Sequence, residues 1–176
     1  MPRIDLILGG CKSGKSSMAL SLAEASQAKP KTYLATCQPL DEEMQDRVER
    51  HRQERGPEWQ TLEEPLFIAQ AVRECSSPGT LLLIDCLTMW LSNLLGAGTS
   101  GEAIRDRYSE LQSSLDEAKG EVILVANEVG LGIVPENPLA RRFRDEAGVL
   151  NQRLGSIADR VVFMAAGFPL PLKGAL

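Results

Sequence analysis

The stretch RIDLILGGCKSGKSSMALSLAE, residues 3–24, decides the fold class. Its apolar run over residues 4–8 predicts a buried strand, and from Ser16 to Ala25 the apolar residues recur at helical spacing. Residues 9–16 read GGCKSGKS and match the pattern G-x-x-x-x-G-K-[ST]. Because a strand is predicted before this motif and a helix after it, it is interpreted as a phosphate-binding P-loop rather than a chance glycine-rich turn.

The residue types of this loop suit a nucleotide triphosphate. Its glycines let backbone N–H groups turn inward around phosphates, and the following helix presents its positive end to the anion. Lys15 is expected to reach the β- and γ-phosphates as a catalytic residue, and the Ser16 hydroxyl to bind Mg²⁺. The predicted nucleotide-binding residues of the loop are Gly9, Gly10, Cys11, Lys12, Ser13, Gly14, Lys15 and Ser16.

A second candidate metal residue is Asp85, which ends the apolar run LLLID in the manner of a Walker B strand. A carboxylate at a buried strand end is costly unless it has a partner such as a metal ion. The alternative is that Asp85 caps the helix that follows. Beside a P-loop the metal role is favoured, so Ser16 and Asp85 are predicted to form the Mg²⁺ site.

Strands and helices are predicted to alternate along the chain, which favours an α/β fold with a mostly parallel sheet covered by helices on both faces. One domain is expected over residues 1–176. Further strands are predicted at 32–38, 80–86, 121–127 and 160–167, the last being the final strand, and a short one within the connector 57–65. Helices are predicted at 41–55, 65–75, 86–96, 102–118 and 139–158, and the last nine residues are expected to be peripheral.

Ligands of such sheets bind at the carboxyl ends of the strands. This rule brings four segments of the predicted fold into one neighbourhood: residues 9–16, 36–38, 85–88 and 127–130. The last of these opens a long Gly- and Pro-rich loop, residues 128–138, of a kind that often carries function.

Composition narrows the function classes. The 176 residues are 43% apolar and 24% charged, as in an ordinary soluble domain, and the net charge of −5 argues against a nucleic-acid partner. No apolar run approaches a membrane span and the N-terminus lacks a signal-peptide layout, so a cytoplasmic protein is expected. Without metal-binding spacing, the four cysteines are predicted to be reduced thiols: Cys11, Cys37, Cys75 and Cys86.

The one histidine, His51, lies in the predicted helix 41–55 and shares a face with Met44 and Val48. Taken alone, packing at the edge of that apolar face is the favoured interpretation. Nearby arginines provide positive charge that can hold a triphosphate: Arg47, Arg50, Arg52 and Arg55. A neutral imidazole among these cations is a competent nucleophile toward phosphorus, which would suit a nucleotidyltransferase better than a simple kinase.

Longer motifs carry a resemblance to a known family. They are GGCKSGKS (9–16), YLATCQPLDEEMQDRVERHRQER (33–55), WQTLEEP (59–65), LLLIDCLTMWLSNLL (81–95) and NEVGLGIVPENPLARRFRDEAGVLNQRL (127–154). Over nearly its whole length the chain resembles the bifunctional adenosylcobinamide kinase/adenosylcobinamide-phosphate guanylyltransferases of cobalamin biosynthesis and salvage.

The resemblance implies a RecA-like P-loop NTPase fold, a homotrimer and two reactions. In the first, a nucleoside triphosphate, ATP or GTP, phosphorylates adenosylcobinamide. In the second, GMP passes from GTP to adenosylcobinamide phosphate through a GMP–histidine intermediate, giving adenosylcobinamide-GDP and pyrophosphate. His51 stands in the matching motif and would be the catalytic nucleophile.

By the same resemblance, GTP contacts extend beyond the P-loop to Thr36, Cys37, Gln38, Arg52, Gln53, Glu54, Arg55, Glu63 and Asp85. Glu63 would bind a guanine edge or ribose, its alternative being an ordinary exposed acid. Asn127 and Glu128 are expected to have a polar role near Mg²⁺ or the corrinoid, or equally to cap a loop or helix. Arg141 and Arg142 fit a subunit contact or a solvated face better than catalysis.

Two other functions stay open on the residues alone. One is a P-loop kinase for small molecules, in which His51 is structural. The other is a nucleotide-binding module without catalysis.

Overall fold

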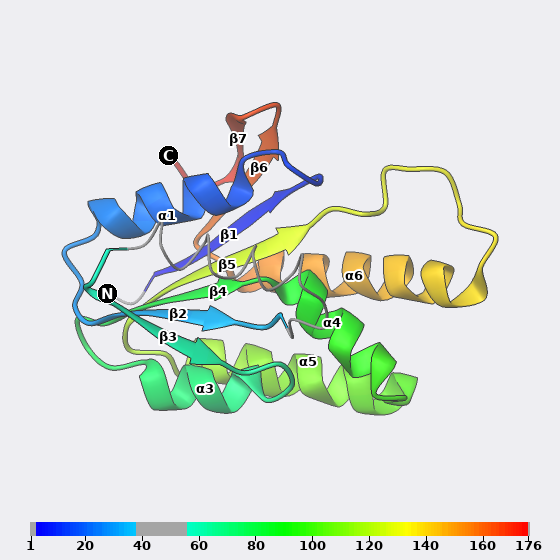
Figure 1. Cartoon of the computed structure of the whole chain (residues 1–176), viewed down its shortest axis with the longest axis horizontal. Helices are drawn as coiled ribbons and strands as arrows, with labels where there is room; N and C mark the ends of the chain where they lie inside the picture. The colour runs from blue at the N-terminus through cyan, green and yellow to red at the C-terminus, as the bar shows by residue number, and fades with distance from the viewer. Residues whose placement is uncertain (1–2, 38–55, 176) are drawn as a thin grey trace.

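The computed structural model describes residues 3–37 and 56–175; the predicted helix 41–55 lies outside the described residues. Within them, seven strands form one sheet in the order β3-β2-β4-β5-β1-β6-β7 (Figure 1). All neighbouring pairs are parallel except β6 with β7. The strands are β1 (Ile4–Gly9), β2 (Lys31–Ala35), β3 (Trp59–Glu63), β4 (Leu81–Asp85), β5 (Glu121–Asn127), β6 (Arg160–Ala165) and β7 (Phe168–Lys173).

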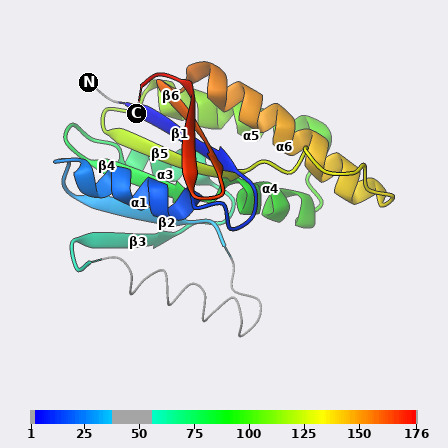
Figure 2. The same cartoon turned by 90° about the horizontal axis from the view of Figure 1, so that it is seen from above.

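Helices cover both faces of the sheet, as predicted (Figures 1 and 2). Those described are α1 (Lys15–Ala25), α3 (Ile68–Cys75), α4 (Leu87–Gly96), α5 (Gly101–Asp116) and α6 (Pro138–Ile157). Two of the described helix starts are fixed by polar caps: the Ser100 hydroxyl accepts from Ala103 N, and Asn137 Oδ1 accepts from Leu139 N and Ala140 N. None of the helices within residues 3–37 and 56–175 is long and apolar enough to cross a membrane.

The central strands read as continuous apolar runs because they are buried on both faces. Leu6 and Leu124 belong to one apolar cluster, which α3, α4, α5 and α6 cover. Their neighbours Ile7 and Ile123 point the other way, into a second cluster beneath α1. This alternation fixes which residues of each strand face α1.

The prediction that residues 160–167 form the final strand was wrong. β6 is followed by a two-residue turn, Ala166 and Gly167, both with positive φ, and by β7, which pairs antiparallel with β6. Pro169 and Pro171 alternate along β7, so the missing N–H groups lie on one side of an edge strand, where proline is tolerated. All six residues of β7 are exposed, which agrees with a peripheral position.

The parallel registers bring the carboxyl ends of the strands to one edge. Gly9 pairs with Asn127 and with Met164, and Ala35 pairs with Asp85 and with Glu63. The P-loop, the Walker B acid and the start of the 128–137 loop therefore meet at this edge, as the sequence predicts.

Candidate active site

The P-loop leaves β1 at Gly9 and enters α1 at Lys15. Three residues of the loop have positive φ: Gly9, Lys12 and Gly14, with values of 152°, 53° and 99°. Gly14 is the N-cap of α1, and no side chain caps this helix. The unsatisfied N–H groups of the first turn and the turned loop backbone thus form an anion-binding concavity at the positive end of a helix.

The back of the loop is held by backbone from distant parts of the chain. Glu128 N donates to Gly9 O at 3.0 Å, and Gly167 N, in the β6–β7 turn, donates to Ser13 O at 3.0 Å. A Cβ on Gly9 would lie 2.5 Å from Met164 O, so the loop and β6 are in direct contact. The sequence predicts that Glu128 lies near the P-loop, but it does not point to Gly167 or Met164, because no short motif links the loop to a turn more than 150 residues away.

Lys15 is buried, with 7% of its surface exposed, and its Nζ donates to Gly10 O at 2.6 Å. The ammonium group therefore lies against the backbone near the beginning of the P-loop. A buried ammonium needs compensating charge or hydrogen bonds, and a phosphate placed in the loop would supply both.

The two predicted metal residues lie together. Ser16 Oγ donates to Asp85 Oδ2 at 3.0 Å, and the Tyr33 hydroxyl donates to the same oxygen at 3.1 Å. The N-cap of α4 is Cys86 and has no side-chain cap, so Asp85 does not serve as the helix cap. A hydroxyl and a carboxylate are the hard oxygen donors that Mg²⁺ prefers, so this pair fits the ion.

No group of three or more His, Cys, Asp or Glu side chains that could hold a metal occurs within residues 3–37 and 56–175. Mg²⁺ in nucleotide sites uses few protein ligands and takes the others from water and phosphates. The small donor set of Ser16 and Asp85 therefore agrees with a metal that arrives with a nucleotide.

Thr36 and Cys86 join β2 to the start of α4. The Thr36 hydroxyl donates to Cys86 O at 2.7 Å and accepts from Cys86 N at 3.0 Å, while Asn93 Nδ2 donates to Thr36 O at 2.7 Å. Burial and, less strongly, the Asp85 carboxylate raise the pKa of the Cys86 thiol to about 11. Both side chains thus act in the structure of this edge, and Cys86 stays a protonated thiol at neutral pH.

The other predicted GTP contacts divide into two groups. Cys37 follows Thr36 and is half-buried, and Glu63 is exposed at the carboxyl end of β3. The rest lie outside the described residues: Gln38, the nucleophile candidate His51, Arg52, Gln53, Glu54 and Arg55.

Asn127 and Glu128 are held by local contacts. The Asn127 N–H donates to Thr88 Oγ1 at 2.6 Å and its carbonyl accepts from Asn151 Nδ2 at 3.3 Å. Glu128 Oε1 accepts from Gly130 N at 2.6 Å, which closes a turn at the start of the 128–137 loop. Of the two roles expected equally for Glu128, this contact fits the capping of a loop and does not test a role near Mg²⁺ or the corrinoid.

The loop of residues 128–137 extends away from the sheet in Figure 1. It exposes large apolar side chains, with Leu131 81% and Ile133 96% exposed. Arg141 Nη1 donates to the carbonyls of Pro135 and Glu136 and braces the loop against α6. Arg142 Nη2 donates to Thr99 O at 3.1 Å, so both arginines have structural partners.

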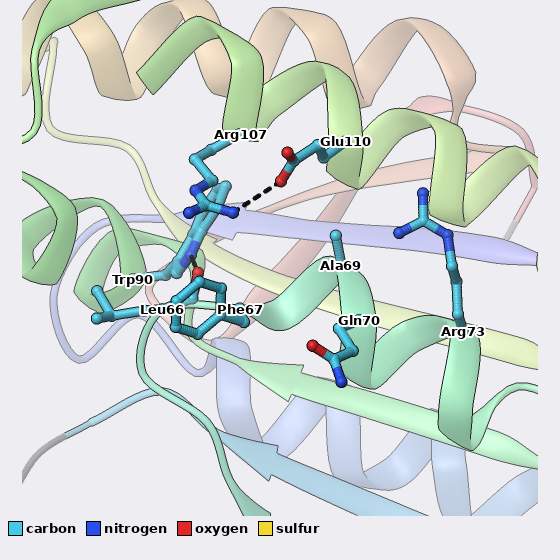
Figure 3. A pocket seen from close by; sticks show the side chains of 8 residues that line it. All are labelled: Leu66, Phe67, Ala69, Gln70, Arg73, Trp90, Arg107 and Glu110. Atoms are coloured by element: carbon cyan, nitrogen blue, oxygen red, sulfur yellow. Dashed lines mark hydrogen bonds and ion pairs between the residues drawn. The ribbon is translucent and has the colours of Figure 1, made fainter. Parts of the chain in front are cut away.

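A separate hollow of about 390 Å³ lies among α3, α4 and α5, on the opposite sheet face from α1 (Figure 3). Arg107 lies 4.8 Å from the centre of the Phe67 ring and pairs with Glu110 at 2.9 Å. Arg73 pairs with Glu117 at 3.3 Å. The arginines that line the hollow, Arg73 and Arg107, are therefore both paired with acids. None of the predicted site residues lines the hollow.

A family model described as cobinamide kinase / cobinamide phosphate guanyltransferase, CobU, matches residues 5–172. The chain belongs to the CobU family. The family predicted from the sequence motifs is therefore confirmed, and it is a family of transferases.

Curated relatives match the CobU-family chain over nearly their whole length. The bifunctional adenosylcobalamin biosynthesis protein CobP of Pseudomonas aeruginosa is 47% identical over 170 residues, covering 97% of both chains. The protein CobU of Escherichia coli, with the same description, is 36% identical over 181 residues and covers 96% of this chain and 98% of its own.

Solved structures show the fold. A type III secretion ATPase of pathogenic bacteria superposes with a TM-score of 0.56 at 14% identity, covering 96% of this chain and 56% of its own. The assembled ATPase EscN of enteropathogenic E. coli gives a TM-score of 0.59 at 13% identity, covering 94% and 43%. The predicted P-loop NTPase fold, with its mostly parallel sheet, is confirmed.

Proposed function

We propose that this chain phosphorylates adenosylcobinamide with a nucleoside triphosphate and then transfers GMP from GTP to the product, giving adenosylcobinamide-GDP and pyrophosphate. The observation that carries the proposal is the P-loop with Ser16 and Asp85 3.0 Å apart, within a chain that matches the CobU family over residues 5–172. Adenosylcobinamide, ATP and GTP are its substrates.

In the kinase step, the loop backbone and Lys15 bind and orient the phosphates of the donor nucleotide. Ser16 and Asp85 would hold Mg²⁺, which neutralises charge on the β- and γ-phosphates when it is bound. The support for these roles is the buried Lys15, whose Nζ donates to Gly10 O within the loop, and the hard oxygen donors of the Ser16–Asp85 pair. The remaining P-loop residues contribute the backbone N–H groups that surround the phosphates.

In the guanylyl step, a neutral ring nitrogen of His51 attacks the α-phosphorus of GTP. The new P–N bond replaces the bond to pyrophosphate, which leaves. A phosphate oxygen of adenosylcobinamide phosphate then attacks the same phosphorus, the P–N bond breaks and the imidazole is restored. The support is that His51 is the single histidine of the chain and stands in the family motif.

The other expected properties belong to the same proposal. Beyond the P-loop, GTP contacts come from Thr36, Cys37, Glu63 and Asp85 of the described residues, and from Gln38 and residues 52–55 of the others. A single domain over residues 1–176 is supported by the one continuous sheet. A homotrimer is supported by the exposed apolar loop 128–137. A cytoplasmic location is part of the same proposal.

Product analysis tests the proposal. The protein, Mg²⁺, adenosylcobinamide and GTP are incubated, and the corrinoids are separated by chromatography. The proposal predicts adenosylcobinamide phosphate first and adenosylcobinamide-GDP later, and His51→Ala stops the reaction at the phosphate. Phosphate alone from the wild-type protein would favour a plain kinase, and no product would favour a nucleotide-binding module without catalysis.

A further inference from the structure

Tyr33 is a buried tyrosine whose hydroxyl reaches the candidate metal site. The residue lies on β2 with 7% of its surface exposed, packed in the apolar cluster beneath α1. Its hydroxyl donates to Asp85 Oδ2 at 3.1 Å. Nothing in the sequence singles out Tyr33, because an aromatic residue in an apolar strand is an ordinary core residue.

The sheet register explains how the contact forms. Tyr33 of β2 is paired with Leu83 of β4, and Ala35 of β2 is paired with Asp85 of β4. Tyr33 is therefore a diagonal neighbour of Asp85 on the adjacent strand, displaced by two residues toward the amino end. A tyrosine is long enough to span such a diagonal between neighbouring strands. The ring fills space among apolar side chains, and the hydroxyl approaches the carboxylate from inside the protein.

Tyr33 and Ser16 both donate to the same carboxylate oxygen. Among the described residues, the hydrogen bonds to the Asp85 side chain all end on Oδ2. An oxygen that accepts two hydrogen bonds has used both its lone pairs, which leaves Oδ1 as the stronger acceptor for a metal-bound water. The two donors also fix the rotation of the carboxylate about its last torsion.

We propose that Tyr33 is a positioning residue for the Mg²⁺ site, holding the Asp85 carboxylate in the orientation that receives the metal's water shell. The inference rests on the proposed function, because that function assigns Mg²⁺ to Ser16 and Asp85. Partners that orient a metal-binding carboxylate commonly contribute about 10–100-fold to metal affinity or activity. A phenylalanine would fill the same apolar space without this effect.

The test is Tyr33→Phe, with Tyr108→Phe as the matched control. The chain has two tyrosines, and both are buried. The Tyr108 hydroxyl donates to Glu146 Oε2 at 3.2 Å, within the cluster on the opposite face of the sheet. Each variant therefore removes one buried hydroxyl and its bond to a carboxylate, but the control does so away from the P-loop.

The measurement is the Mg²⁺ concentration at which binding of a fluorescent, non-hydrolysable GTP analogue is half-saturated. A separate titration with Mn²⁺ uses the paramagnetic resonance of the ion to follow metal binding directly. Tyr33→Phe is expected to raise that concentration about tenfold, with nucleotide affinity at saturating metal unchanged. Tyr108→Phe is expected to match the wild-type protein. In an Asp85→Asn background, Tyr33→Phe should add no further change, because the carboxylate it orients is absent.

An unchanged metal requirement in Tyr33→Phe, or an equal shift in Tyr108→Phe, overturns the inference while the proposed function stands. A Tyr33→Phe protein too unstable to bind nucleotide overturns it too, because the hydroxyl would then act through the fold. If the wild-type protein binds the analogue equally well without a divalent metal, the metal site of the proposed function fails, and the inference falls with it.

Discussion

Gly9→Ala tests the contact between the P-loop and β6. Gly9 has φ of 152°, and a Cβ there would lie 2.5 Å from Met164 O and 2.6 Å from Ser13 Oγ. The nearest atom is a backbone carbonyl in the middle of a sheet, so it cannot swing aside as a flexible side chain would. Either β6 and the loop separate or the variant unfolds more easily.

The cost has two parts. A non-glycine residue held at an unfavourable backbone conformation costs about 1–3 kcal/mol. Forcing an extra methyl group into a packed site costs about 1–3 kcal/mol more. The free energy of unfolding should therefore fall by about 2–6 kcal/mol, a large part of the roughly 5–15 kcal/mol that stabilises a typical domain.

The assay is urea unfolding without nucleotide, followed by circular dichroism, together with GTP binding at a temperature where the variant is folded. Gly10→Ala is the matched control from the same loop, because a Cβ on Gly10 would meet nothing within 4 Å. It should stay within about 0.5 kcal/mol of the wild-type protein in unfolding free energy. Equal losses in the two variants, or a Gly9→Ala protein with wild-type stability and GTP affinity, would show that close contact between Gly9 and β6 does not limit stability.

Three further predictions concern the site, the core and the thiols. Asp85→Asn should lower both activities about 10–100-fold at a fixed Mg²⁺ concentration, measured by product formation, with the unfolding midpoint nearly unchanged; unchanged rates would remove Asp85 from the metal site. Arg160 donates two hydrogen bonds to buried Asp5, at 3.0 and 2.8 Å, and the half-exposed Arg3 also pairs with Asp5 Oδ2 at 3.0 Å. Because Arg3 stays paired with Asp5, Arg160→Leu should cost about 1–3 kcal/mol in urea unfolding, and adding Asp5→Leu should restore much of it. A double variant no more stable than Arg160→Leu alone would contradict this interpretation of the ion pair. The Cys86 pKa rises from 9.0 to about 11 on folding, so its contribution to stability is complete below pH 9 and is lost as pH rises toward 11. At pH 8, iodoacetamide should therefore alkylate exposed Cys11 well before Cys86, as read by mass spectrometry; early modification of Cys86 would be contrary to its burial.

The parts of the fold that the sequence predicts are those with a local signal. Residues 9–16 carry a motif whose chemistry demands a strand before and a helix after, and Asp85 ends an unbroken apolar run. Such runs mark strands buried on both faces, so β1, β4 and β5 follow directly. β7 has no such signal, because its six residues are exposed and two of them are prolines.

The parts that the sequence does not predict depend on pairings across the fold. Tyr33 meets Asp85 only because β2 and β4 are neighbours in a particular register. Gly167 supports Ser13 only because the β6–β7 turn lies behind the P-loop. In both cases the residue type is ordinary, and its role comes from a partner that no short motif contains.

The proposed function requires one chain both to transfer a phosphoryl group and to form a GMP–histidine intermediate. The most direct test is to incubate the protein with Mg²⁺ and GTP labelled at the α-phosphate and to look for label on the denatured protein. A GMP–histidine intermediate should give a label that is labile in acid and stable in alkali, as a phosphoramidate is, and His51→Ala should abolish that label. No label on the wild-type protein, or a label that survives His51→Ala, would contradict it.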